Sequence, residues 1–204
     1  LISSFGFGND EVEYAKGCYI YTKCGKKILD VTGGIGVLGH GHNHDRILKV
    51  RSHFSENNKM EVHKNYFSPF LAALSHNVAK LLPEDLNISY FPNSGAEAVE
   101  GAVKMAYKFH KGERKYILHS NISFHGKLLG AASLTGSPEL DFSFPRIPNV
   151  ESFFYNDIRS IERKINALKK DNGDSDIYAI IIEPLNASSM LSCSKVFLQK
   201  LRQL

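Results

Sequence analysis

The segment best suited to ligand chemistry is residues 92–98, with the sequence PNSGAEA, which opens a long amphipathic pattern. A helix N-terminus offers free backbone N–H groups and a partial positive charge, and both favour a phosphate dianion. Gly95 lets the backbone approach a ligand closely, and Ser94 can add a hydroxyl donor. The same residues also fit a capping box between Ser94 and Glu97, which needs no ligand. From this segment alone the two interpretations carry equal weight.

Two further segments place reactive side chains where strands are expected to end. Residues 123–127, SFHGK, contain Phe124, which could stack on a planar ligand, and His125, which could act as a base. A buried aromatic ring and a structural histidine are the simpler interpretations of this pair. Glu183 closes the apolar run 177–182, and α/β proteins bind ligands at the carboxyl ends of strands. The alternative is a carboxylate satisfied by an arginine or a backbone amide.

The elements that must position these segments alternate between strands and helices. The patterns predict strands at 88–91, 116–119 and 177–182, and helices at 94–110, at 126–134 and from Ser194 or Lys195. Upstream they predict two short strands within 17–30, a glycine-rich loop at 31–44, and helices from Asp45 and from Ser68 to Pro83. The run 177–182 does not alternate, which is typical of a strand in a parallel sheet covered on both faces. The predicted fold class is therefore α/β.

The amino-acid composition limits the classes of protein to which the chain can belong. The chain has 204 residues, of which 43% are hydrophobic and 23% charged, as in ordinary folded domains, and no run reaches the ~20 apolar residues of a membrane helix. The net charge of +4 comes from interleaved charges, which disfavours nucleic-acid binding but leaves room for one small phosphate. Three cysteines without a CxxC pair, and no visible signal peptide, predict a cytoplasmic protein.

Four motifs in order resemble the class III (ornithine, acetylornithine and putrescine-type) aminotransferases of the fold-type I superfamily, which depend on pyridoxal 5'-phosphate (PLP). They are GCYIYTKCGKKILDVTGGIGVLGHGH, NSGAEAVEGAVKMA, FHGKLLGAASLTG and AIIIEP. The resemblance implies an N-terminal segment at 1–60 that contributes to a small domain. It also implies that 61–204 is the first part of a large cofactor-binding domain with a mostly parallel sheet.

The resemblance also implies roles for matching positions. Gly95 and Ala96 would donate backbone N–H groups to the cofactor phosphate with Ser94 close by, and Phe124 would stack on the pyridine ring. The cofactor site would further include His125 and Glu183, and the substrate side would include Ile35 and Lys127. No lysine in the chain has the context expected of the one that forms a Schiff base with the cofactor. We therefore expect the chain to be an N-terminal fragment.

The chain departs from the family pattern at three positions. Lys127 stands where acetylornithine-type members have an arginine, and lysine keeps the charge but loses the two-pronged geometry. Asn186 and Ser188 stand where many members have glutamine and glutamate. These differences leave the donor open among a diamine, an ω-amino acid and an amino acid.

The resemblance implies a homodimer that moves an amino group between an amine and a keto or aldehyde acceptor by a ping-pong mechanism. An aminomutase of the same family and a catalytically degenerate relative remain alternatives. A metallohydrolase is a further alternative, because His40, His42 and His44 lie within five residues of one another. No second cluster of ligand residues supports that alternative, so no metal site is predicted.

Overall fold

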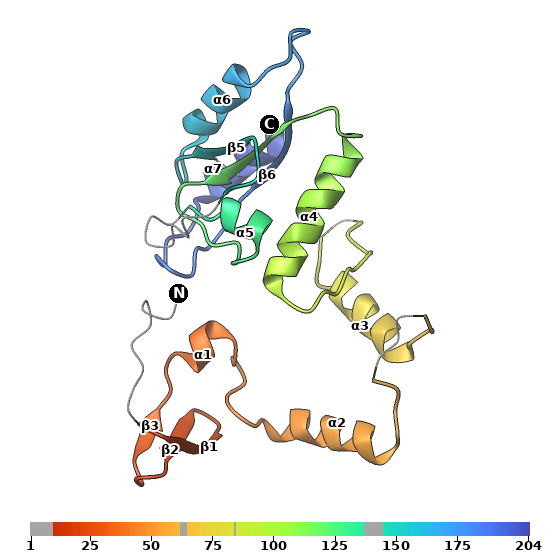
Figure 1. The fold of residues 1–204 in the computed structure, drawn as a ribbon, viewed down its shortest axis with the longest axis vertical. Coiled ribbons are helices and arrows are strands. Elements are labelled where there is room, and N and C mark those ends of the chain that lie inside the picture. The colour runs from red at the N-terminus through yellow and green to blue at the C-terminus, as the bar shows by residue number, and fades with distance from the viewer. Residues whose placement is uncertain (1–9, 62–64, 84, 137–144) are drawn as a thin grey trace. The chain divides into compact units, whose positions relative to one another are not determined.

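The computed structural model describes residues 10–61, 65–83, 85–136 and 145–204. The chain divides into two compact units, Leu1–Leu74 and Ser75–Leu204, which are described separately (Figure 1).

The first unit begins with a small antiparallel sheet. Its strands are β1 (Val12–Lys16), β2 (Tyr19–Thr22) and β3 (Lys27–Leu29), in the order β1-β2-β3. The β2–β3 hairpin is as predicted, whereas β1 was not. The sheet is followed by the short α1 (Gly33–Gly36) and by α2 (Asp45–Glu56), and α3 (Pro69–Ala79) spans the division between the units. The prediction of a loop at 31–44 is confirmed, although the segment contains α1. Gly34 and Ile35 inside α1 have left-handed backbone angles, so α1 is not a regular helix.

The second unit is built on a parallel sheet. Its strands are β4 (Tyr116–Ser120), β5 (Val150–Phe153) and β6 (Ile177–Ile181), in the order β5-β4-β6. Helices α6 (Ile158–Ala167) and α7 (Lys195–Gln203) cover one face, where Leu118, Phe153, Ile161, Ile177 and Phe197 form the buried core. Helix α4 (Gly95–Phe109) lies on the other side of the sheet and contacts the short α5 (Leu129–Ser133) (Figure 1). The predicted α/β class with a parallel sheet is confirmed.

Several elements differ from the prediction. Strand β5 and helix α6 were not predicted, because their interleaved charges resemble a solvated segment. Residues 88–91 form no strand: they pair with nothing within the described residues, and Ile88 is 94% exposed. The predicted helix at 126–134 is shorter, because Gly126 has a φ of 120° and the helix begins only at Leu129.

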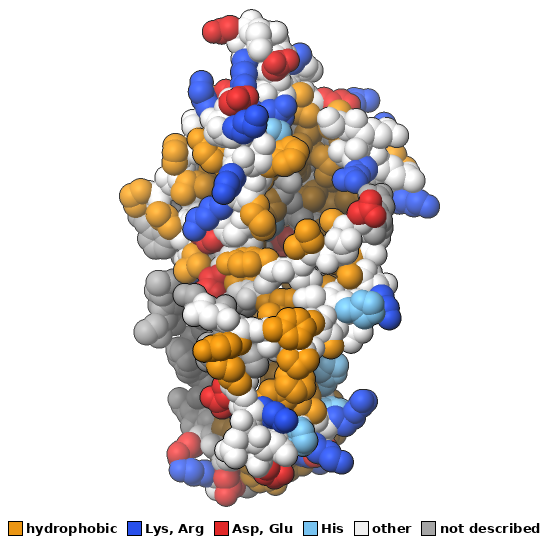
Figure 2. Space-filling view, turned by 90° about the vertical axis from the view of Figure 1, so that its right-hand side faces the viewer, with side chains coloured by type: hydrophobic (Ala, Val, Ile, Leu, Met, Phe, Trp, Pro, Cys, Tyr) orange, Lys and Arg blue, Asp and Glu red, His pale blue; other side chains and the backbone are white. Residues whose placement is uncertain are grey.

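Hydrophobic side chains remain at the surface of both units. They include Val12 and Leu29 in the first unit, and Leu81, Met105 and Phe109 in the second; Figure 2 shows orange side chains over much of the visible face. In the part of the chain that the structure describes, no helix has both the length and the apolar character needed to cross a membrane.

Candidate active site

The first part of the site is the N-terminus of α4, where a capping box forms. The hydroxyl of Ser94 accepts a hydrogen bond from the backbone N–H of Glu97 at 3.2 Å. In return the Glu97 carboxylate accepts one from the backbone N–H of Asn93 at 2.6 Å. The Ser94 hydroxyl therefore satisfies one donor of the first helical turn, and the Glu97 carboxylate satisfies the N–H just before the N-cap.

The cap leaves two donors at the same helix end. The first intrahelical hydrogen bond is donated by Ala98 to the carbonyl of Ser94 at 3.0 Å, so the N–H groups of Gly95 and Ala96 lie ahead of the ladder. Within the described residues, neither of them donates to a protein acceptor. A Cβ atom at Gly95 would meet nothing within 4 Å, so this side of the helix end is open. The cap and an anion site are therefore compatible here.

The aromatic segment lies directly against this helix end. A Cβ atom at Gly126 would come within 2.6 Å of Ala96 Cβ, so the backbone at 126 packs on the first turn of α4 with no room for a side chain. Phe124, two residues earlier, is 38% exposed and offers part of its ring to a ligand. Segments 94–96 and 124–126, predicted to act together, are thus brought together.

Glu183 joins the same arrangement from the end of β6. Its carboxylate oxygen Oε2 accepts hydrogen bonds from the backbone N–H of Phe124 and from Asn186 Nδ2, both at 2.7 Å. Phe124 and Glu183 are 59 residues apart in the chain. The carboxylate therefore fixes the backbone that carries the aromatic ring.

His125 is buried beside this carboxylate, with 8% of its surface exposed. Its backbone N–H donates to Thr135 Oγ1 at 3.2 Å, while its ring Nε2 is buried and meets no hydrogen-bond partner among the described residues. Burial lowers the pKa of His125, and the neighbouring Glu183 opposes that shift. The imidazole is therefore favoured in its neutral form.

Two residues that the sequence did not single out complete the scaffold. Glu100 accepts hydrogen bonds from the backbone N–H groups of Gly130 at 2.8 Å and Ala131 at 3.1 Å, so α4 caps α5. The hydroxyl of Tyr155 lies within hydrogen-bond distance of three carbonyls in the segment after β6 and donates to one of them at a time, and burial raises its pKa to about 12. Glu100 lies four residues after Ala96, on the same helix face, and that spacing was the signal available in the sequence.

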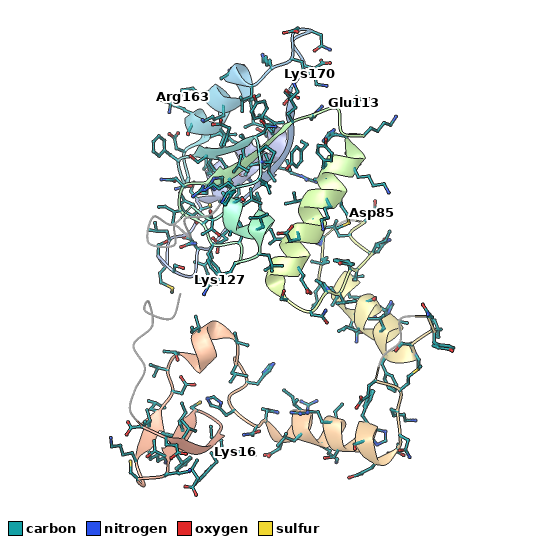
Figure 3. The ribbon with its side chains drawn as sticks, in the orientation of Figure 1. Lys16, Asp85, Glu113, Lys127, Arg163 and Lys170 are labelled. Carbon is teal, nitrogen blue, oxygen red and sulfur yellow. The ribbon has the colours of Figure 1, made fainter. Side chains whose placement is uncertain are left out.

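The two predicted substrate residues lie in different units. Lys127 is exposed on the loop before α5, at the end of the second unit where α4 begins (Figure 3). Ile35 belongs to the first unit, is 79% exposed, and has φ 62° and ψ 52°. A left-handed backbone is rare for a β-branched residue, so the glycine-rich loop holds Ile35 in a strained conformation.

Asp30 organises that loop. Its carboxylate accepts hydrogen bonds from the Thr32 N–H and hydroxyl and from the Gly33 N–H, at 2.8 to 3.0 Å, and it contacts His42 Nε2 at 2.8 Å. The contact with His42, and then the bonds from Thr32 and Gly33, lower the pKa of Asp30 to about 2.

This pairing accounts for His42 without a metal. In the described ranges of the chain, no group of three or more His, Cys, Asp or Glu side chains is arranged to hold a metal ion. The alternative of a metal loop at His40, His42 and His44 gains no support from these described residues.

Comparisons with known proteins agree with this architecture. A family model for class-III aminotransferases matches residues 9–204. An acetylornithine aminotransferase of Prochlorococcus marinus subsp. pastoris is 31% identical over 194 residues, which is 92% of this chain and 46% of that protein. A putrescine aminotransferase of Pectobacterium atrosepticum is 32% identical over 164 residues, which is 79% of this chain and 34% of that protein.

Solved structures share the fold. A transaminase from the marine bacterium Virgibacillus superposes with a TM-score of 0.85 at 20% identity, over 96% of this chain and 46% of that one. An ornithine aminotransferase from Toxoplasma gondii, whose active site is partly occupied by PLP, superposes with a TM-score of 0.75 at 18% identity. That match covers 97% of this chain and 46% of the other.

The fold and the family match define the class of protein. The chain belongs to the class-III aminotransferases. It spans about half the length of the curated relatives it matches.

Proposed function

We propose that the protein containing this chain is a PLP-dependent aminotransferase. It moves an amino group from an amine donor to a keto or aldehyde acceptor by a ping-pong mechanism. The observation that carries the proposal is the junction of three segments: the open N-terminus of α4, the aromatic segment packed on it, and Glu183 bonded to that segment. These are an anion site, a flat apolar surface and a fixed carboxylate within one unit.

The residues present fit the cofactor. The free N–H groups of Gly95 and Ala96 and the positive end of a 15-residue helix suit its phosphate, with Ser94 beside them. The partly exposed Phe124 suits its ring. When bound, PLP supplies an electron sink for the amine substrate, and the protein supplies binding and orientation.

The chain's own residues have three tasks in this reaction. The α4 N-terminus binds the phosphate, and Glu183 holds the Phe124 backbone so that the ring keeps its position. His125, buried and favoured neutral, fills the space beside Glu183 and excludes water there without adding a positive charge. The lysine that takes part in proton transfer is not assigned to any residue of this chain.

The substrate proposal rests on Lys127 and the segment after Glu183. The exposed ammonium of Lys127 attracts a negative group without the two-pronged geometry of arginine, which favours a substrate that carries a carboxylate, such as an ω-amino acid or an amino acid. The relatives include a putrescine aminotransferase, so a diamine is also proposed as donor, although Lys127 itself would not attract it. We propose that Lys127, and separately Ile35 of the first unit, belong to the substrate side.

Assembly and domain roles are also proposals. We propose a cytoplasmic homodimer, as the family resemblance implies. The exposed hydrophobic residues of both units suit burial by further protein, either the remainder of the protein or a second copy. Residues 1–60 would contribute to a small domain, and 61–204 would form the first part of the large one. Sedimentation of the whole protein tests the dimer, and a monomer at micromolar concentration contradicts it.

The test of the function is PLP binding and turnover by the whole protein. We expect a visible absorbance band that changes on adding an amine donor and returns on adding a keto acceptor. Phe124→Ala should weaken PLP binding about tenfold or more, whereas Phe109→Ala, which truncates an exposed ring at the far end of α4, should not.

The outcomes separate the alternatives. A protein that retains no PLP contradicts the proposal, and PLP binding without turnover of any amine indicates a degenerate relative. An aminomutase would return the amino group to the carbon skeleton that donated it, which product analysis detects.

A further inference from the structure

The segment after β6 folds back on itself around a buried asparagine. Asn186 is 1% exposed, and its backbone N–H donates to the carbonyl of Leu191 at 2.9 Å. An isolated bridge between Leu185 and Ser192 closes the loop just outside this bond. The side chain of Asn186 is therefore held in a small, closed turn next to Glu183.

The hydrogen-bond partners of Asn186 fix the orientation of its amide. The side-chain oxygen accepts from the backbone N–H of Ser189 at 2.9 Å and from the Ser189 hydroxyl at 2.7 Å. A backbone N–H can only donate, so the amide oxygen must face it. The amide nitrogen consequently faces Glu183 Oε2, a carboxylate that can only accept when ionised.

The same Glu183 oxygen holds the aromatic segment. Oε2 receives the amide of Asn186 and the backbone N–H of Phe124, each at 2.7 Å. Two donors converging on one oxygen fix the rotamer of the carboxylate more firmly than either does alone. The chain of contacts therefore runs from the Ser189 turn through Asn186 and Glu183 to the backbone of Phe124.

We propose that Asn186 is a positioning residue of the cofactor site: it holds Glu183 in the rotamer that fixes the Phe124 ring for PLP. The inference rests on the proposed function, because it assigns a purpose to the position of Phe124. It goes further by naming a buried amide, outside the four recognised motifs, on which PLP affinity depends.

The first variant is Asn186→Asp in the whole protein. It preserves shape and the acceptor for Ser189, but it removes the donor to Glu183 and sets two carboxylates against each other. We expect the dissociation constant for PLP, measured by titrating the apo-protein, to rise about tenfold or more, since hydrogen bonds to charged groups are among the stronger ones.

Asn156→Asp is the matched control. Asn156 accepts from the Ser194 backbone N–H and, among the described residues, makes no hydrogen bond to Glu183, so PLP affinity should stay within about twofold.

The second variant is Ser189→Ala in the whole protein. It removes the hydroxyl that donates to the Asn186 side-chain oxygen at 2.7 Å and leaves Asn186 and Glu183 in place. The amide is then oriented by the Ser189 backbone N–H alone, so Glu183 is held less firmly, and we expect the dissociation constant for PLP to rise about threefold. If Asn186→Asp does not fold, this variant carries the test: a folded Ser189→Ala protein that binds PLP as tightly as the original protein overturns the proposal.

The experiment separates the two levels of the claim. Original protein that binds no PLP refutes the proposed function, whereas original protein and Asn186→Asp that bind PLP equally refute only the role of Asn186. Urea unfolding of the apo-proteins gives the independent readout. A purely structural role predicts lower stability in Asn186→Asp with unchanged PLP affinity, and that result also overturns the proposal.

Discussion

Gly126 is the residue at which two of the site's segments meet. A Cβ atom there would lie 2.6 Å from Ala96 Cβ, and its φ of 120° disfavours any other residue. Gly126→Ala should lower the free energy of unfolding by about 2–4 kcal/mol, from overpacking together with backbone strain. Chemical denaturation measures the change, and PLP titration should show weaker binding, because α4 and the aromatic segment are pushed apart.

Gly173→Ala is the control for this prediction. Gly173 has a φ of 85° but open space around it, so this change reports backbone strain alone, about 1 kcal/mol. Equal losses at the two positions would mean that the contact between Gly126 and Ala96 contributes nothing beyond conformation.

His119, in the central strand, makes stability depend on pH. It is buried, and burial is the main cause that lowers its pKa from 6.5 to about 4, while its Nδ1–H donates to the carbonyl of Ser120 at 2.9 Å. Between pH 4 and pH 6.5 the unfolded chain binds a proton at His119 that the folded chain does not bind. The free energy of unfolding is therefore highest above about pH 6.5, falls as the pH drops, and levels off below about pH 4.

The size of this effect is about 3 kcal/mol at most, at 1.36 kcal/mol per pKa unit. His119→Asn keeps a donor close to the Nδ1 position but does not titrate in this range. Urea unfolding at pH 7 and pH 4 should therefore show a smaller loss of stability in His119→Asn than in the original protein. Equal losses would exclude His119 as the cause.

Sequence could identify the residue types of the site but not all of their contacts. Ser94, Gly95 and Phe124 were singled out because they stand at expected strand and helix ends. The bond from Glu183 to the Phe124 backbone could not be predicted, because it depends on a side-chain rotamer. Asn186 was noted only as a departure from a family pattern, since no local pattern signals a buried amide that faces a carboxylate.

At the scale of elements, the helix cap of α4 has a matched counterpart in α7. Ser94 and Ser194 are both N-caps whose hydroxyls accept from the backbone N–H three residues later, each at 3.2 Å. Ser94→Ala and Ser194→Ala should each reduce stability by about 1 kcal/mol in chemical denaturation. Only Ser94→Ala should also weaken PLP binding, because only that helix end is proposed to hold the phosphate. Equal PLP affinities in the two variants would show that the cofactor phosphate does not bind at the N-terminus of α4.

Elements were predicted well where their pattern was local and poorly where it depended on neighbours. The apolar run of β6 and the capped, amphipathic α4 and α7 match their predicted positions. Residues 88–91 have strand-forming composition, yet a strand also needs a partner, and none lies within the described residues. Strand β5 was missed because it opens a segment of interleaved charges that resembles a solvated one, yet its four residues pair with β4 along their whole length.

At the scale of the whole chain, burial is unevenly distributed. Within the described residues, every buried hydrophobic side chain lies between Ile117 and Phe197, in the second unit. The first unit is held by its sheet, by the stacked rings of Tyr14 and Tyr21 at 4.4 Å, and by the bonds around Asp30. Backbone hydrogen bonds without a buried apolar layer give little protection against local opening.

We therefore expect the two units of the 204-residue chain to differ in hydrogen exchange. Amides of β4, which is paired on both sides, should exchange at least about a hundredfold more slowly than amides of β1, β2 and β3. Leu118→Ala removes a fully buried side chain from the core, at a cost of about 2–5 kcal/mol. It should therefore speed exchange in β4, β5 and β6 and leave the first sheet unchanged. Faster exchange in β1–β3 as well would mean that both units unfold as one cooperative body, because the first unit would then draw its stability from the core around Leu118.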